Sequence, residues 1–179
     1  MPVIPYRQTQ THSCLAACFL MLLQDRTRRP IDEGAEQELT LKGSLRSYPF
    51  YVVGIPTEFA NAFQARIRIF AHNKYFTGFL EKAFRRQKRI SVQHHKITHE
   101  FLRALLRQHP IVFHIDDHYL GRFSGSHFVI LEKELPNDRV LLIDPWTGKR
   151  KRLSFAKLEE SMESLKTHMK MCPLVFILE

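Results

Sequence analysis

The chain has 179 residues, which suits one domain and is too short for two domains of ordinary size. Hydrophobic residues make up 44% of the sequence and aromatic residues 11%, a composition that excludes a disordered chain. Charged residues make up 25% and no long apolar run is present, so we expect no membrane span. The formal net charge of +9 permits an acidic peptide or a nucleic acid as a partner. We predict a single domain over residues 1–179.

The sequence contains three cysteines, Cys14, Cys18 and Cys172, which are too few for a disulfide framework. Reduced thiols are typical of cytoplasmic proteins, and the cytoplasm is therefore the predicted location. Residues 15–18 look like a lipoprotein cleavage site, but the apolar run follows this site, whereas in an export signal it precedes it. We do not expect export on that signal.

The first half of the chain predicts mainly helices. The first helix runs from about Ser13 to Gln24, with apolar side chains on one stripe. Residues 25–50 are charged and interrupted by Gly and Pro, which predicts a loop with at most one short helix. Pro56 is interpreted as lying near the first turn of a second helix. Further predicted elements are a strand over Arg66–Ala71, a helix around Tyr75–Gln87, and a helix that Thr98 caps and that ends before Pro110.

The second half of the chain predicts mainly strands, because Val, Ile and Phe dominate short runs between turn residues. Asn137-Asp138 predicts a hairpin turn, and residues 145–148 predict the next turn. A helix over residues 154–164 precedes the last strand. Helices followed by antiparallel strands are typical of an α+β fold, with the first helix packed against the sheet. The predicted strands are Ile111–Ile115, His127–Lys133, Val140–Ile143, Lys149–Leu153 and Leu174–Leu178.

Cys14 begins an apolar helix, where unpaired backbone N–H groups favour a thiolate over a thiol. A thiolate can attack a carbonyl carbon, but it needs a general base and donors for the oxyanion. Gln8 lies on the segment that enters the helix, so its amide is a candidate oxyanion donor. His127 begins an apolar strand after small residues and is the candidate base. Asp144 ends the neighbouring strand, from which its carboxylate could orient the His127 ring.

These residues stand in a pattern that resembles a known family. Gln8, then Cys14-Leu15-Ala16-Ala17 after five intervening residues, then His127-Phe128-Val129-Ile130, and finally Asp144-Pro145-Trp146-Thr147-Gly148 resemble the bacteriocin-processing peptidases. These are papain-like cysteine peptidases that cut after a double-glycine leader. The resemblance implies a papain-like fold, with Cys14 as nucleophile, His127 as base, Asp144 as orienting residue and Gln8 as oxyanion donor. It implies no cofactor and no metal, and a peptide or protein as substrate.

The sequence also departs from that family. Most members of that family carry an acidic residue before the cysteine and a glycine after it, whereas Ser13 and Leu15 stand at these positions. Residues 25–50 are interpreted as an insertion. Many relatives are fused to a membrane export ATPase, but this chain contains no phosphate-binding loop motif. It is therefore similar to a free-standing member, and we do not carry the double-glycine specificity over to it.

Other chemistry receives less support from the sequence. His99 begins a string similar to a zinc-protease motif, but Arg103 stands where the second histidine ligand is required. His114 and His118 flank Asp116 and Asp117, and we interpret all four as solvated loop residues. Basic runs cover residues 85–89 and 149–152 without a recognised nucleic-acid motif, so we do not expect nucleic-acid binding. A set of phenylalanines is expected to fill the core: Phe59, Phe63, Phe70, Phe76 and Phe79.

Three classes of function therefore remain for this sequence. The first is a cysteine peptidase acting on a peptide or protein, and it is the function that we predict. The second is an acyltransferase that uses the same Cys-His-Asp residues, with an amine in place of water as the acyl acceptor. The third is a peptide-binding module on this fold that has lost turnover. Because the shape of the pocket selects the acceptor, the sequence leaves the first two classes open.

Overall fold

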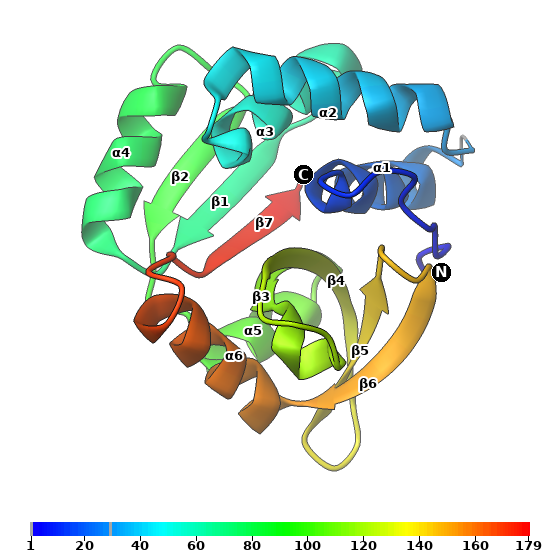
Figure 1. Ribbon diagram of the computed structural model, residues 1–179, viewed down its shortest axis with the longest axis vertical. Coiled ribbons are helices and arrows are strands. Elements are labelled where there is room, and N and C mark those ends of the chain that lie inside the picture. The colour runs from blue at the N-terminus through cyan, green and yellow to red at the C-terminus, as the bar shows by residue number, and fades with distance from the viewer. Residues whose placement is uncertain (1, 29) are drawn as a thin grey trace.

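A computed structural model describes residues 2–28 and 30–179 (Figure 1). None of the helices in these two segments is both long and apolar enough to cross a bilayer. The elements in chain order are α1 (Cys14–Thr27), α2 (Glu33–Ser47), α3 (Tyr51–Phe63), β1 (Ile67–Ala71), α4 (Lys74–Phe84), β2 (Ile90–His94), α5 (His99–Leu106), β3 (Ile111–Asp116), the 3-10 helix η1 (Asp117–Leu120), β4 (Ser126–Leu135), β5 (Arg139–Asp144), β6 (Lys149–Ser154), α6 (Phe155–Thr167) and β7 (Leu174–Leu178).

The strands form a seven-stranded sheet in the order β2-β1-β7-β3-β4-β5-β6. β1 and β2 pair in parallel, with α4 as the crossover between them, and the other neighbours pair antiparallel. The α+β class predicted from the sequence is confirmed. The expectation of a purely antiparallel, C-terminal sheet is wrong, because β1 and β2 come from the first half of the chain and extend one edge of the sheet.

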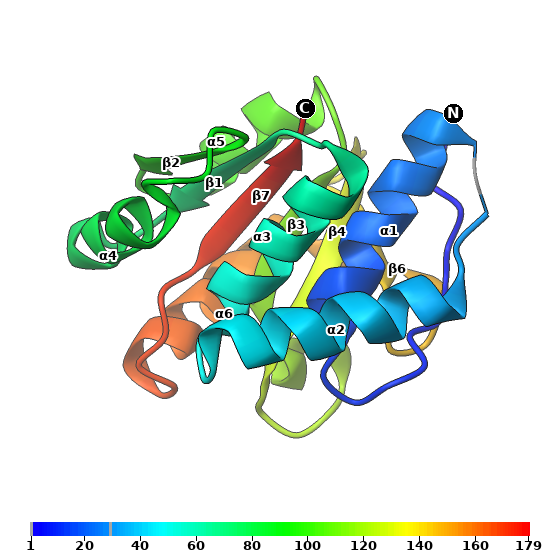
Figure 2. The same ribbon diagram turned by 90° about the horizontal axis from the view of Figure 1, so that it is seen from above.

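Each face of the sheet carries its own hydrophobic core. On β7, Leu174, Phe176 and Leu178 pack with α1, α3 and α4, whereas Val175 and Ile177 pack with α5 and α6. This alternation follows from the two-residue repeat of a strand, and it explains why the run is apolar throughout. Figure 2 shows α1, α2 and α3 on one side of the sheet, with α6 on the other. As predicted, the first helix packs against the sheet.

α2 is the largest departure from the sequence analysis. The structure forms 15 residues of helix within the segment predicted to be mainly a loop. Asp32 caps this helix by accepting a hydrogen bond from the backbone of Gly34 at 2.8 Å. Gly43 suggests a helix breaker in the sequence, but here it lets α2 approach α3. A Cβ atom on Gly43 would lie 2.6 Å from the side chain of Ile55.

Pro56 lies inside α3, and the prediction that it stands near the first turn is wrong. A proline in a helix interior removes one backbone hydrogen bond, a cost that tertiary packing can offset. That packing is dense here, because Ile55 and Phe59 on α3 are fully buried. α3 therefore begins at Tyr51, earlier than its proline indicates.

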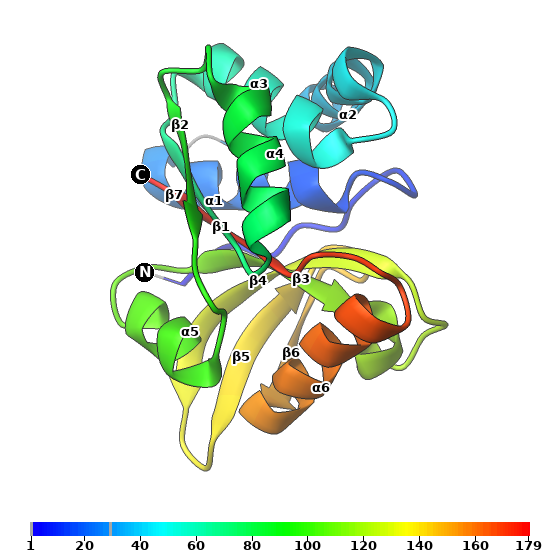
Figure 3. The same cartoon turned by 90° about the vertical axis from the view of Figure 1, so that its left-hand side faces the viewer.

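Most of the other predicted elements are confirmed to within a few residues. Thr98 caps α5 by accepting from Phe101 N, and both Asn137 and Asp138 adopt positive φ angles in the turn between β4 and β5. β2 was not predicted, because it is a short edge strand in which Ser91 and Gln93 are exposed. Figure 3 shows β2 and α4 at the same end of the molecule as α2 and α3.

Candidate active site

Cys14 is the first residue of α1 and is 7% exposed. The preceding Ser13 does not cap this helix: its backbone is not in a capping conformation, and its hydroxyl is held by Gln10 O at 2.8 Å and by the Glu36 carboxylate. The backbone N–H groups of the first turn of α1 therefore keep no side-chain acceptor. Such open N–H groups stabilise negative charge, so the helix start can bind an oxyanion that forms beside Cys14.

His127 and Asp144 lie on the neighbouring strands β4 and β5, as the sequence predicts. The Nε2 atom of His127 is 3.0 Å from Oδ1 of Asp144, and both residues are buried. Because an ionised carboxylate only accepts hydrogen bonds, Nε2 carries the proton and Nδ1 is the ring nitrogen left for Cys14. The structure thus brings together all three members of the predicted triad.

Burial alone would lower the pKa of His127, since it disfavours the charged ring. Hydrogen bonds with Asp144 and with the Cys14 side chain, together with the negative charges of Cys14 and Asp117, raise this pKa to about 9. The environment of His127 therefore stabilises an imidazolium. An imidazolium next to a cysteine is the arrangement in which a thiolate nucleophile is paired with the acid that later protonates a leaving group.

Asp144 accepts more hydrogen bonds than its predicted role requires. Arg122 donates to Oδ2 at 2.9 Å and Lys151 lies 3.3 Å from the same atom. The Thr147 hydroxyl and the Trp146 backbone N–H also donate to this carboxylate. Burial raises the pKa of Asp144, but the hydrogen bonds and charges of His127 and Arg122 hold it well below its usual value. Asp144 is therefore ionised throughout the neutral range.

The turn after Asp144 contacts the segment that enters α1. Gly148 has a φ angle of +65°, and a Cβ atom at this position would lie 2.9 Å from the Cβ atom of Arg7. Glycine thus serves both the turn and a close approach of two backbones. Next to this contact, the backbone N–H of Gln8 donates to Pro145 O at 2.7 Å. The turn therefore fixes Gln8 next to the end of β5.

The side chain of Gln8 is 7% exposed and is not free. Its Nε2 atom donates to Gln10 O at 2.6 Å and lies 3.4 Å from Thr11 O. Its Oε1 atom is buried and has no hydrogen-bond partner among the described residues. The structure thus holds the Gln8 amide within its own loop, with one short hydrogen bond and one long one.

A polar link joins His127 to a neighbouring cavity. Ser126, the residue before His127, lies with its hydroxyl 2.8 Å from Nε2 of His114 and 3.0 Å from the Tyr51 hydroxyl. His114 is buried in β3, so its interpretation as a solvated loop residue is wrong, as is that of the fully buried Asp116. Burial lowers the pKa of His114 to about 4, which keeps this ring neutral.

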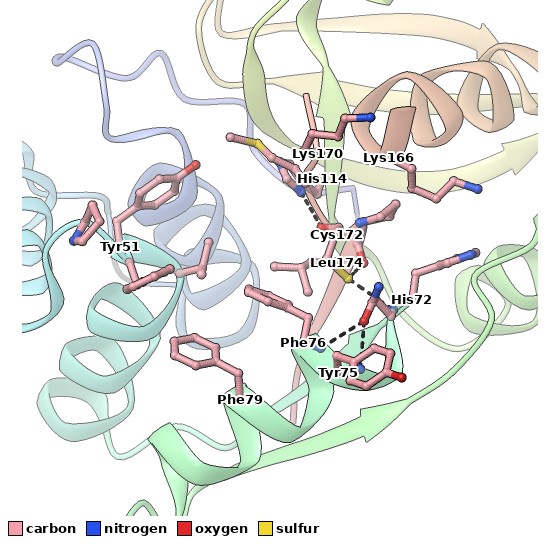
Figure 4. Close-up of a pocket in the computed structure, with 16 residues that line it drawn as sticks. Tyr51, His72, Tyr75, Phe76, Phe79, His114, Lys166, Lys170, Cys172 and Leu174 are labelled. Atoms are coloured by element: carbon pink, nitrogen blue, oxygen red, sulfur yellow. Dashed lines mark hydrogen bonds between the residues drawn. The ribbon is translucent and has the colours of Figure 1, made fainter. Parts of the chain in front are cut away.

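The cavity has a volume of about 840 Å³, and both Tyr51 and His114 line it (Figure 4). Phe76 and Phe79 point from α4 toward α3, and the Phe79 ring contacts the Phe50 ring at a tilt, with the ring centroids 5.0 Å apart. Phe79 is 37% exposed, so its prediction as a core residue is wrong, while Phe59 and Phe70 are buried as predicted. The cavity is of the size and apolar character that small-molecule and side-chain pockets have.

The other two thiols lie in different environments. Cys18 is fully buried in α1 and donates to Phe128 O at 3.6 Å, and burial raises the pKa of its thiol well above the usual value. Burial also raises the pKa of Cys172, which lines the cavity. The described residues contain no group of three or more potential metal ligands.

Three residues at the site were missed by sequence reasoning: Glu36, Tyr51 and Arg122. Each reaches the site from an element distant in sequence from its partner, such as Tyr51 and Ser126, which are 75 residues apart. A charged residue after a short turn, such as Arg122, carries no local pattern that would single it out. The comparisons with known proteins add no further assignment, because no protein-family model matches the sequence and no significant match is found among curated proteins.

Proposed function

We propose that this protein is a thiol hydrolase of the papain-like cysteine peptidase type, acting on a peptide or protein. The observation that carries this proposal is the buried pair of His127 and Asp144 beside Cys14 at the open start of α1. A structural cysteine or histidine does not need this environment. The reduced thiol that the reaction requires also favours a reducing compartment such as the cytoplasm.

The proposed reaction begins with the Cys14 thiolate and the His127 imidazolium. The sulfur attacks the carbonyl carbon of the scissile amide, and a C–S bond forms as the carbonyl oxygen becomes an oxyanion. Nδ1 of His127 then protonates the leaving amine, and the C–N bond breaks to give a thioester. Water then attacks the carbonyl carbon of this thioester while His127 takes a proton from the water. The C–S bond breaks, the carboxylic acid product is released, and Cys14 is regenerated.

The proposal has two sources of donors for the oxyanion. The backbone N–H groups at the start of α1 are one source, since Ser13 leaves them uncapped. The Gln8 amide is the second source in this proposal. Its contact with Thr11 O is long, at 3.4 Å, and is the one that an oxyanion would replace. The shorter hydrogen bond to Gln10 O would then keep the amide in place.

The cavity favours a substrate that has a bulky apolar group near the reacting carbonyl. His114, a polar residue in the cavity wall, is already paired, because it contacts Ser126 at one ring nitrogen and Cys172 O at the other. An alkyl or aryl group can enter such a cavity without leaving protein donors unpaired. The same group could belong to the acyl donor of an acyltransferase, so amine acceptors belong in the activity screen.

The proposal is tested by labelling the protein with iodoacetamide and locating the modified cysteine by mass spectrometry. Cys14 should react first and keep reacting below pH 7, since the helix start and His127 stabilise its thiolate. Cys18 and Cys172 should react slowly, because burial raises the pKa of both thiols.

His127→Ala is the matched variant in this experiment. It removes the imidazolium but leaves Cys14 in place, so labelling of Cys14 below pH 7 should fall to that of an ordinary thiol. Equal labelling of all three cysteines in the unaltered protein would refute an activated nucleophile. Labelling of Cys14 that is the same with and without His127 would remove the base from the mechanism.

A further inference from the structure

Glu36 is a buried carboxylate in the middle of the segment that sequence analysis treats as an insertion. It lies on α2 and is 0% exposed. Among the described residues it forms no ion pair with lysine, arginine or histidine. Taking a carboxylate out of water without a cation is costly unless hydrogen bonds replace the lost solvation. Its hydrogen-bond partners therefore indicate why the position is acidic.

All of these partners lie in the segment that leads into Cys14. Tyr6 donates its hydroxyl to Oε2 at 2.5 Å, and Thr9 donates its backbone N–H to Oε1 at 2.9 Å and its hydroxyl to Oε2 at 3.1 Å. Ser13, the residue before Cys14, donates its hydroxyl to Oε1. One carboxylate thus binds the segment at three residues that bracket Gln8. Burial and Glu36 together raise the pKa of Tyr6 well above its usual value, so this donor keeps its proton.

The Ser13 contact has a second effect on the helix start. A serine at this position normally caps the helix with its hydroxyl, which would occupy the backbone N–H groups of the first turn. Here Ser13 is not in a capping conformation, and its contacts with the Glu36 carboxylate and with Gln10 O hold the hydroxyl oxygen where it accepts none of those N–H groups. Glu36 therefore does two things at once: it fixes the loop of Gln8, and it leaves the N–H groups around Cys14 uncapped.

We propose that Glu36 is a positioning residue for the oxyanion site of this protein, acting through Ser13 and Thr9 and not by touching the substrate. This inference rests on the proposed function, since it concerns the step in which the Cys14 thiolate adds to a carbonyl. Without the carboxylate the loop of residues 6–13 has no common acceptor, and the Ser13 hydroxyl can turn back onto α1. The oxyanion then loses donors, whereas the His127–Asp144 pair does not depend on Glu36, whose side-chain hydrogen bonds go to Tyr6, Thr9 and Ser13.

The test compares two reactions of Cys14 that differ in their need for an oxyanion site. Iodoacetamide alkylates the thiolate by displacing iodide, so no oxyanion forms. p-Nitrophenyl acetate acylates the thiolate through an oxyanion, the C–S bond forms, and p-nitrophenolate leaves as a coloured burst. We expect Glu36→Gln to slow the burst about 10-fold or more relative to alkylation, with the pH dependence of alkylation unchanged. Gln8→Ala should show the same selective loss.

Glu38→Gln is the matched control, since it makes the same change on the exposed side of α2, where Glu38 is 61% exposed and pairs with Lys42. It should alter neither reaction. If Glu36→Gln does not fold, as judged by its thermal unfolding, Thr9→Val removes one donor to the carboxylate and carries the same expectation. Glu36→Asp should recover part of the burst rate.

The outcomes separate the inference from the function on which it rests. A selective loss of the burst in Glu36→Gln supports the positioning role. An equal slowing of both reactions, or a lower melting temperature with both rates intact, overturns it and leaves Glu36 as a purely structural residue. If Cys14 of the unaltered protein reacts with neither reagent faster than a free thiol, the proposed function itself fails.

Discussion

Asp144 accepts hydrogen bonds from a ring, a guanidinium, a hydroxyl and a backbone N–H, so its carboxylate is both the orienting group of the site and its electrostatic centre. The His127 ring is held by one Asp144 oxygen, Oδ1, while Arg122 and Thr147 bind the other, Oδ2. The ring orientation therefore depends on the charge and the acceptor character of this single side chain.

Asp144→Asn should keep the fold but lower the burst of p-nitrophenolate by roughly 10²–10⁴-fold. An asparagine can present an N–H to Nε2, which favours the ring tautomer with the proton on the wrong nitrogen. The burst rate and the thermal unfolding midpoint are measured on the same preparation. Retention of the full burst rate would show that the ring is oriented without the carboxylate.

Arg122 competes with His127 for Asp144, which gives a second test at the residue scale. In Arg122→Gln the carboxylate has one cation fewer to neutralise it, so it stabilises the imidazolium more and the pKa of His127 rises. In a plot of the burst rate against pH, the decline on the alkaline side should move to higher pH by up to about 1 pH unit. Arg68→Gln, which removes a surface arginine paired with Glu179, should leave the profile where it is. A shift to lower pH would contradict the argument.

At the scale of elements, α2 and α3 are held close by two glycines. A Cβ atom on Gly54 would lie 1.8 Å from the carbonyl oxygen of Gly43, so the two helix backbones touch at this point. The contact matters for the site because α2 carries Glu36 and α3 begins with Tyr51. A separation of the two helices would move both residues.

Gly54→Ala should therefore destabilise the protein by about 2 kcal/mol or more, since neither backbone can retreat without unpacking the core around Ile55. Gly78→Ala is the matched control in α4, because nothing lies within 4 Å of a Cβ atom at that position. It should stabilise the protein by about 0.5–1 kcal/mol through a better helix propensity. Denaturant unfolding of both variants measures the difference, and equal effects would contradict the close contact.

The sequence predicts elements where one local signal dominates. α5 has a threonine cap and an apolar stripe, and β7 is a short apolar run, so both are found with nearly the correct ends. α2 was missed because Gly34 and Gly43 suggest a loop, and their actual use, a cap contact and a close approach to α3, depends on tertiary structure. β2 was missed because an edge strand keeps polar side chains and lacks the fully apolar run of a central strand.

The same division applies to the candidate site. Cys14, His127 and Asp144 lie at the ends of strongly patterned elements, so their order along the sequence was sufficient to predict that they meet. Glu36 and Arg122 contact their partners across turns and helices that carry no such pattern. The papain-like fold and the family resemblance remain predictions, since the structure establishes the α+β class.

At the scale of the whole molecule, two buried histidines give opposite pH dependences. Burial lowers the pKa of His114 to about 4, below the usual 6.5, so its neutral form stabilises the fold fully above pH 6.5 and this contribution is lost as the pH falls toward 4. The pKa of His127 is raised to about 9, so its contribution is full below pH 6.5 and is lost as the pH rises toward 9.

We therefore expect maximal stability near pH 6.5, with a decline on each side that belongs to a different residue. The unfolding midpoint of the unaltered protein is measured from pH 4 to pH 9 beside His114→Gln and His127→Gln. The first variant should flatten the acid side, leaving the loss at lower pH from protonation of Asp144, and the second should flatten the alkaline side. If the unfolding midpoint of His114→Gln still falls between pH 6.5 and pH 4.5, that loss of stability belongs to groups other than His114.

The hydrogen bond from the Cys18 thiol to Phe128 O spans 110 residues of sequence, and it joins the helix that carries the nucleophile to the strand that carries the base. During synthesis α1 leaves the ribosome long before β4 and β5 exist. Through that interval neither the imidazole nor the carboxylate lies beside Cys14. The thiol therefore gains its base only when the sheet closes, which delays the chemistry until the fold that confines it is complete.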